Sequence, residues 1–230
     1  MSQGSLTLGA SSSISTSAWV QIDSGATLTT TAISGGHVFS GSTVISGGGS
    51  ITGSLQIGVN AQIRPGTTSD AANAATAGDG AGTLAVSAAL VFTPVAASTV
   101  AQFQIFGSGS ADKITVGTNL VLNGSSDIAV TFAGTYTPGW GDSWELIDWV
   151  GTLTTGGFST GTNLRSGLNT DLNEGNLDLP DLTPYGQLWQ ISNFSGSGSL
   201  IIKIVPEPSR LILLALGATH LLWRRHRRRS

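Results

Sequence analysis

The stretch that decides the fold is residues 44–57, Val44-Ile-Ser-Gly-Gly-Gly-Ser-Ile-Thr-Gly-Ser-Leu-Gln-Ile57. Short apolar runs alternate here with small polar residues and glycine turns, and the same pattern extends over residues 6–64 with a turn signal roughly every ten residues. Such spacing predicts short strands in a sandwich, a barrel or a β-solenoid. A solenoid stacks like residues over like, which suits repeated Ser-Gly corners and isolated Ile, Leu and Val positions, so we favour the solenoid.

Farther along, residues 66–82 lack any large apolar side chain, which predicts a loop or a boundary. Beyond them the strands become longer, with apolar residues at every second position and therefore one buried face. We expect an all-β protein with solenoid coils over 1–70, a β-rich end or cap over 71–204 and a separate terminal segment over 205–230. The strand pairs are Leu84/Val86, Leu90/Phe92, Phe103/Ile105, Ile114/Val116, Leu120/Leu122 and Ile128/Val130/Phe132.

Composition and charge narrow the class of protein. Gly/Ser-rich tracts favour disorder, but 40% of the residues are hydrophobic and lie in alternating runs, which favours folded β structure. Residues 1–205 hold four basic and twelve acidic residues, whereas residues 206–230 hold six arginines and Glu207. An acidic body with a basic tail argues against nucleic-acid binding and fits a membrane-proximal tail. The chain has no cysteine, which excludes disulfides and thiolate sites.

Two segments resemble the passenger ends of proteins with autotransporter-associated β-strand repeats. They are Gly58-Val-Asn-Ala-Gln-Ile-Arg-Pro-Gly66 and Tyr136-Thr-Pro-Gly-Trp-Gly-Asp-Ser-Trp-Glu-Leu-Ile-Asp148. The stretches 179–182, 186–189 and 198–202 are similar to the closing segment of that family, so the resemblance covers roughly residues 55–204. It implies a right-handed parallel β-helix with a β-rich cap, acting as a secreted or surface-exposed structural passenger. It supplies no catalytic residues.

The carboxyl terminus combines an extended motif, an apolar run and a basic cluster. Pro206 and Pro208 keep the chain extended, because each fixes φ and restricts the residue before it. The apolar run 211–223 would enter the membrane, and the arginines after it would stay in the cytoplasm by the positive-inside bias. The motif is Val205, Pro206, Glu207 and Pro208; the apolar run contains Leu211, Ile212, Leu213, Leu214, Leu216, Leu221, Leu222 and Trp223; the arginines are Arg224, Arg225, Arg227, Arg228 and Arg229.

These three parts, in this order, resemble a PEP-CTERM sorting signal. The resemblance covers residues 205–230 and implies recognition by an exosortase in the inner membrane, processing near Pro206–Pro208, and release to the surface of a Gram-negative bacterium. Such passengers are commonly linked with exopolysaccharide. One departure is length: 13 residues make a helix of about 20 Å against a bilayer core of about 30 Å, although flanking arginines can snorkel and the bilayer can thin. The alternative is a buried core helix with a solvated basic end.

An exported protein needs an export signal, and Met1-Ser-Gln-Gly-Ser-Leu6 has neither a basic nor an apolar region. We therefore expect an in-frame extension upstream that encodes a signal peptide and further Ser-Gly-punctuated coils.

Catalytic chemistry has few candidates in this sequence. His37 stands alone in a Gly-rich segment, so we predict an exposed turn residue without a catalytic or metal role. Asp142, Glu145 and Asp148 could form a glycosidase pair, but in a regular strand Glu145 points away from the other two. Residues 107–114 are faintly similar to calcium-binding nonapeptide repeats, but the motif occurs once, so Asp112 is predicted to be a turn residue. No cofactor, metal or nucleotide site is expected.

Tryptophans gather in the same region, at Trp140, Trp144 and Trp149, with Trp189 later in the chain. Aromatic rings on a β surface can stack on sugars, but we favour their filling the core of the cap. The sequence thus predicts a non-enzymatic, exported envelope or extracellular-matrix protein. A carbohydrate-binding module that uses residues 140–149 is the alternative, and a polysaccharide-processing enzyme is the least supported.

Overall fold

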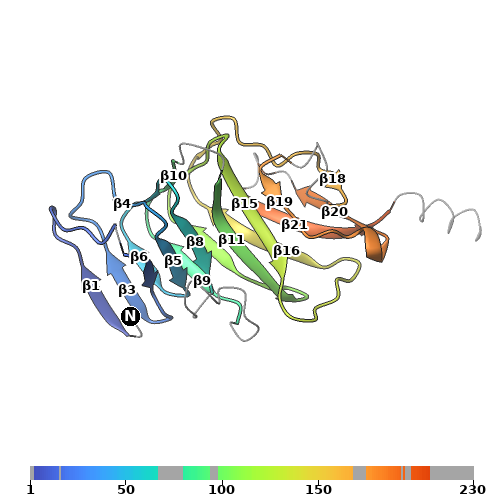
Figure 1. Cartoon of the computed structure of the whole chain (residues 1–230), viewed down its shortest axis with the longest axis horizontal. Coiled ribbons are helices and arrows are strands. Elements are labelled where there is room, and N and C mark those ends of the chain that lie inside the picture. Colours follow the sequence, from blue (N-terminus) through green and yellow to red (C-terminus); the bar gives the residue numbers. More distant parts are fainter. Residues whose placement is uncertain are drawn as a thin grey trace, which may run out of the picture.

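A computed structural model describes residues 3–15, 17–66, 80–93, 98–167, 175–192, 194 and 198–207 (Figure 1). Apart from one short 3-10 helix, Thr183–Tyr185, every regular element in these residues is a strand. The strands form three sheets, called A, B and C below, and most of the pairing is parallel. This arrangement is compatible with a solenoid-like fold.

Each sheet collects strands that lie far apart in the sequence. Sheet A begins with the parallel strands β1 (Gly4–Thr7), β3 (Ala26–Thr29), β6 (Ser50–Thr52), β9 (Thr83–Val86), β13 (Lys113–Val116) and β16 (Ser143–Trp149). Sheet C contains β4 (His37–Phe39), β7 (Leu55–Ile57), β10 (Leu90–Phe92), β14 (Leu120–Val121) and β17 (Leu153–Thr154). Sheet B contains β2 (Trp19–Gln21), β5 (Val44–Gly47), β8 (Gln62–Pro65), β11 (Ser98–Gly107), β15 (Ser126–Phe132) and β19 (Leu177–Asp178), with β12 (Ser110–Ala111) antiparallel to β11. From β3 to β15 the chain visits the sheets in the fixed order A, C, B.

The core consists of apolar columns, because parallel pairing in register places like residues above one another. Period-2 alternation points every second side chain of a strand inward. The central column of sheet A is Leu28, Ile51, Val86, Val116 and Trp149. That of sheet C is His37, Leu55, Leu90, Leu120 and Leu153. That of sheet B is Ile45, Ile63, Ala101, Ile128 and Leu177.

The tight corners need glycine where backbones approach one another. Gly47 has φ +100°, and a Cβ built on it would lie 2.2 Å from the carbonyl oxygen of Ile22. Both the positive φ and the close approach exclude a side chain there. The Ser-Gly punctuation thus reflects a packing requirement between neighbouring turns of the chain.

An antiparallel group closes the C-terminal end of sheet A. It consists of β18 (Leu164–Arg165), β20 (Gln187–Ser192) and β21 (Ser199–Pro206), joined to the parallel part through β16 and β21. Trp189 is fully buried beneath it, with its ring centroid 6.0 Å from that of Trp144, and its Nε1–H donates to the carbonyl oxygen of Pro180 at 2.7 Å. Large aromatic rings therefore fill the junction between the parallel stack and the antiparallel strands.

The strand predictions between residues 84 and 132 are confirmed as β9, β10, β11, β13, β14 and β15, each with a buried face. The predicted boundary near residue 70 falls outside the described residues; β6 before it and β9 after it pair in parallel within sheet A. The predicted membrane helix, 211–223, also lies outside the described residues. Within the described part of the chain, no helix is long and apolar enough to cross a membrane.

Candidate functional site

The start of the predicted sorting motif lies at the end of the last described strand. Val205 and Pro206 form the end of β21, where they pair with Leu188 and Gln187 of β20. The ladder between β21 and β16 ends at Lys203, so among the described strands Val205 and Pro206 pair with β20 alone, and both residues are half-buried. Glu207 is the last described residue, so Pro208, the apolar residues 211–223 and the arginines 224–229 lie outside the described part.

Of the three tryptophans considered for sugar contact, one has an exposed ring. Trp140, which precedes β16, is 59% exposed, whereas Trp144 and Trp149 are buried. The ring of Trp149 packs edge-on against Phe194 at 5.7 Å, and Trp144 Nε1–H donates to the carbonyl oxygen of Gly107 at 2.8 Å. Core filling therefore accounts for Trp144 and Trp149, and stacking on a sugar is left to Trp140 alone among the three.

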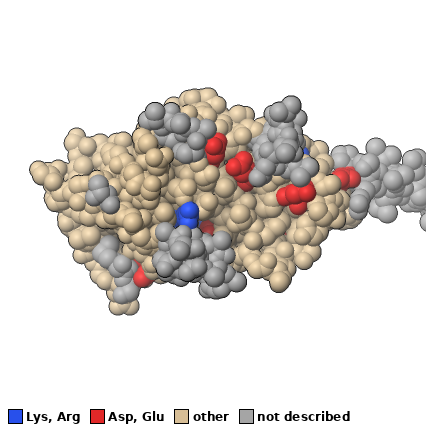
Figure 2. Space-filling model, in the orientation of Figure 1, with Lys and Arg blue, Asp and Glu red and all other residues tan. Residues whose placement is uncertain are grey.

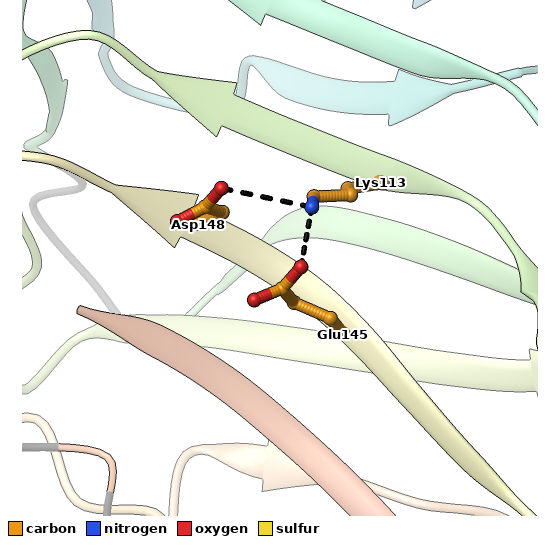
Figure 3. Close-up of polar contacts among 3 residues, drawn as sticks. All are labelled: Lys113, Glu145 and Asp148. Atoms are coloured by element: carbon orange, nitrogen blue, oxygen red, sulfur yellow. Dashed lines mark hydrogen bonds and ion pairs between the residues drawn. The ribbon is translucent and has the colours of Figure 1, made fainter. Parts of the chain in front are cut away.

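The acidic side chains of β16 do not lie as the sequence predicted. Figure 3 shows Glu145 and Asp148 pointing from the same strand toward Lys113 of β13. Lys113 Nζ contacts a carboxylate oxygen of Glu145 and lies 3.6 Å from Oδ2 of Asp148. The prediction that Glu145 and Asp148 face opposite ways is wrong because the register shifts between Glu145 and Ile147. The bulged residue, Leu146, turns inward and resets the alternation.

The ammonium group of Lys113 thus partly offsets the negative charge of Glu145 and Asp148 on the surface of sheet A. All three side chains are a quarter to half exposed, so solvent screens the interaction and its contribution to stability is at most about 1 kcal/mol. Nothing in this arrangement places a proton donor opposite a nucleophile, as a glycosidase pair would require.

Asp142, the third predicted acid, belongs to a different arrangement. Its carboxylate accepts hydrogen bonds from the hydroxyl of Tyr136 and from the backbone N–H of Gly139, the latter at 2.7 Å. Burial alone would raise the pKa of Asp142, but hydrogen bonds from Ser108, Tyr136 and Gly139 outweigh it and lower the pKa below its ordinary value. Burial and the adjacent carboxylate raise the pKa of Tyr136. These groups fasten the loop before β16.

Asp112 is a buried tie between two turns of the chain and not the turn residue that the sequence predicted. It lies between β12 and β13, and its two oxygens accept hydrogen bonds from the backbone N–H groups of Gly82, at 3.2 Å, and Gln104, at 2.9 Å. Among the described residues, no three His, Cys, Asp or Glu side chains gather as a metal site would need.

His37 is likewise buried, where an exposed turn residue was predicted. Its side chain is 3% exposed, sits at the edge of the Leu55–Leu90–Leu120 column and packs edge-on against Phe39. Nε2 has no hydrogen-bond partner within the described chain. Burial lowers the pKa of His37 below its ordinary value. The alternation His37-Val38-Phe39 was the sequence signal for an inward-facing residue.

The outer face of sheet A carries a regular array that the sequence analysis missed. Outward positions of successive strands are paired in register, and in two columns they hold hydroxyl or small side chains as far as β13. One column runs through Ser5, Thr27, Ser50, Ala85, Thr115 and Asp148. A second begins with Thr7, Thr29 and Thr52. The S/T-x-T pattern was visible in the chain, but only the register shows that the pairs lie side by side.

Comparisons of the chain with family models, with curated proteins and with solved structures found no match. Functional arguments therefore rest on the terminal motif and on the surfaces. Figure 2 shows one face of the molecule on which charged side chains are sparse and most acidic ones lie toward the C-terminal half. That face has none of the clustered basic residues by which a folded domain binds nucleic acid.

Proposed function

We propose that this protein is a non-enzymatic, exported structural component of the cell surface or extracellular matrix, sorted by an exosortase through its C-terminal motif. In this proposal the body is a three-sided parallel β-solenoid with an antiparallel cap. The observation that carries the proposal is the sequence 205–230, in which an extended Pro-Glu-Pro motif, an apolar run and five arginines follow one another.

The place where the chain leaves the cap supports this proposal. Val205 and Pro206 end β21, and no described strand follows them. The ladder between β21 and β20 ends at Pro206, so a processing enzyme that cuts after Pro206 would leave every residue pair between these two strands intact. The body could thus be released in folded form.

The motif and the arginines serve different physical purposes in this proposal. The prolines present an extended backbone to the processing enzyme, because neither can adopt an interior helical position without losing a hydrogen bond. The arginines set the orientation, because moving a basic cluster across a bilayer is strongly disfavoured. Changing the motif should therefore impair processing, and changing the arginines should impair orientation in the membrane.

The test is a pair of variants expressed in an exosortase-positive host. Replacing Pro206, Glu207 and Pro208 by Ala should preserve membrane insertion and leave the precursor uncut. Replacing the five arginines of 224–229 by Ser should weaken retention and disturb orientation, with the recognition motif still present. Identical processing of wild type and the triple-Ala variant, measured by intact mass, would refute the proposed role of the motif.

A second candidate function is carbohydrate binding at Trp140, favoured by the exposure of its ring on the loop before β16. Aromatic faces contribute to binding of sugars when their rings are accessible. Trp140→Ala should abolish such binding in a glycan array, whereas Tyr185→Ala, which removes an exposed aromatic ring elsewhere, is the matched control. Equal binding by both variants would exclude Trp140 as the site.

A further inference from the structure

We propose that the outer face of sheet A binds a linear, uncharged polysaccharide along the side chains that cross β6, β9, β13 and β16. This inference goes beyond sorting and surface display, and it places polysaccharide binding on a face other than the Trp140 loop. It rests on three features of the face: a ladder of hydroxyl groups, a depression along that ladder, and the charge at its end.

The hydroxyl ladder provides repeated hydrogen-bonding groups in two adjacent columns, one with Ser50 and Thr115 on either side of Ala85 and the other with Thr52 beside Ser87. Ser50 and Thr52 project from β6, Ser87 follows β9, and Thr115 projects from β13. Adjacent strands lie about 4.8 Å apart, so the four strands span about 14 Å along the stack. Each hydroxyl can donate one hydrogen bond and accept others, which matches the donor and acceptor character of sugar hydroxyls. A linear chain lying across the strands would meet a polar group at each step.

An open depression of about 370 Å³ follows the same line. Ala85, which lies between Ser50 and Thr115 across the strands, and Gly117 line it with a methyl group and no side chain. Gly117 cannot be filled without moving the backbone, because a Cβ there would lie 2.1 Å from the carbonyl oxygen of Ser87. The depression is therefore a fixed feature of the packing, and its size lies within the range of small-ligand sites.

The end of the depression at β16 combines a carboxylate with an exposed apolar side chain. Asp148 lines it, with Lys113 Nζ at 3.6 Å, and Val150 beside it is 81% exposed. A carboxylate accepts strong hydrogen bonds from hydroxyl donors. An exposed Val offers an apolar contact for the carbon–hydrogen face of a sugar ring. This pairing suits a ligand that is itself polar at its edges and apolar on its faces.

Charge decides between ligand classes. The side chains of β6, β9 and β13 that line the depression are uncharged. At its β16 end the carboxylates of Glu145 and Asp148 face the single ammonium group of Lys113, so the net charge there is negative. A polyanion would meet net repulsion at Asp148 and Glu145, and a protein interface of ordinary stability would call for a more apolar centre than Ser, Thr, Ala and Gly provide. An uncharged polysaccharide meets neither objection.

The experiment measures binding of hexasaccharides to full-length protein in mild detergent by calorimetry. Neutral β-1,3-, β-1,4- and α-1,4-linked glucose hexamers are compared with an alginate hexamer. We expect at least one neutral hexamer to bind with Kd below about 1 mM and alginate not to bind in that range. No neutral binding, or alginate binding equal to it, would overturn the proposal.

Two variants locate the site. Ala85→Arg fills the depression and should weaken binding at least about tenfold, as blocking a central contact does. Ala129→Arg is the matched control, because Ala129 is also half-buried and outward-facing but lies in sheet B; its Kd should stay within about twofold. If Ala85→Arg loses its β spectrum, Asp148→Asn replaces it, with a several-fold loss expected. Unchanged binding in folded Ala85→Arg or in Asp148→Asn, or loss in Trp140→Ala instead, would contradict the assignment. Sorting plays no part in this assay, so its outcome is separate from that of the proposed function.

Discussion

Replacing His37 by Leu should stabilise the protein and remove a specific loss of stability at mildly acidic pH. His37 occupies the edge of an otherwise aliphatic column formed by Leu55, Leu90 and Leu120. Its buried Nε2 has no partner among the described residues, and a buried unsatisfied polar atom costs about 1–3 kcal/mol. We expect His37→Leu to raise the free energy of unfolding at pH 7.5 by about 1–2 kcal/mol, allowing for imperfect fit.

The pH dependence follows from the lowered pKa of His37. As pH falls, the unfolded chain takes up a proton near its ordinary pKa of about 6.5, before the folded protein does. The stability linked to neutral His37 is therefore fully present above about pH 6.5 and is lost as pH falls toward the folded-state pKa. One proton accounts for at most about 1.4 kcal/mol per pH unit, so wild type should lose up to about 1.4 kcal/mol through this group by pH 5.5.

Thermal unfolding of both proteins from pH 7.5 to 5.5 tests this reasoning. One kcal/mol corresponds to about 2–4 °C in Tm at this chain length. The gap between His37→Leu and wild type should widen over this pH range, by up to about 6 °C. His226→Leu in the arginine-rich tail is the matched control and should leave the pH dependence unchanged. Parallel curves for His37→Leu and wild type would refute the burial of a neutral imidazole.

Four further substitutions test the packing and the surface ion pairs. Asp112→Ala leaves the N–H groups of Gly82 and Gln104 unpaired, so denaturant unfolding should show a loss of about 2–4 kcal/mol; a loss below 1 kcal/mol would contradict the buried tie. Gly47→Ala should destabilise the protein by several kcal/mol or abolish soluble expression, because its Cβ would meet the carbonyl oxygen of Ile22. The control is Gly109→Ala, at positive φ but with open space around it, which should cost about 1 kcal/mol of stability. Equal losses of stability in the two variants would count against the close approach at Gly47. Lys113→Met should change stability by less than about 1 kcal/mol, and a larger loss would show that the ion pairs with Glu145 and Asp148 are less screened than their exposure indicates.

Period-2 alternation was sufficient to predict the strands between residues 84 and 132, because each of them has one face toward a continuous apolar core. Leu84/Val86 and Ile114/Val116 are examples in which every predicted inward residue is buried. The alternation fails at a bulge, and a bulge leaves no mark in a sequence such as Glu145-Leu-Ile-Asp148. The orientation of Glu145 toward Lys113 was therefore beyond sequence reasoning.

The burial of polar residues was the other feature that the sequence did not predict. His37 and Asp112 stand in Gly- and Ser-rich surroundings that resemble exposed turns, yet each is packed between neighbouring turns of the chain. Whether such a residue is buried depends on which distant backbone groups reach it, as Gly82 and Gln104 reach Asp112. The hydroxyl columns of sheet A have the same origin, since Thr27 and Ser50 become neighbours only through the register.

The central claim is that residues 205–230 direct sorting with removal of the tail, and the intact mass of the mature wild-type protein tests it most directly. The protein is expressed in an exosortase-positive host and in the same host with the exosortase gene deleted, and the product is measured from both. The account predicts a product that lacks residues 209–230 in the first host and a full-length, membrane-retained precursor in the second. A product that keeps residues 209–230 at steady state in both hosts would contradict it, because the terminal segment would then be an anchor and no sorting signal.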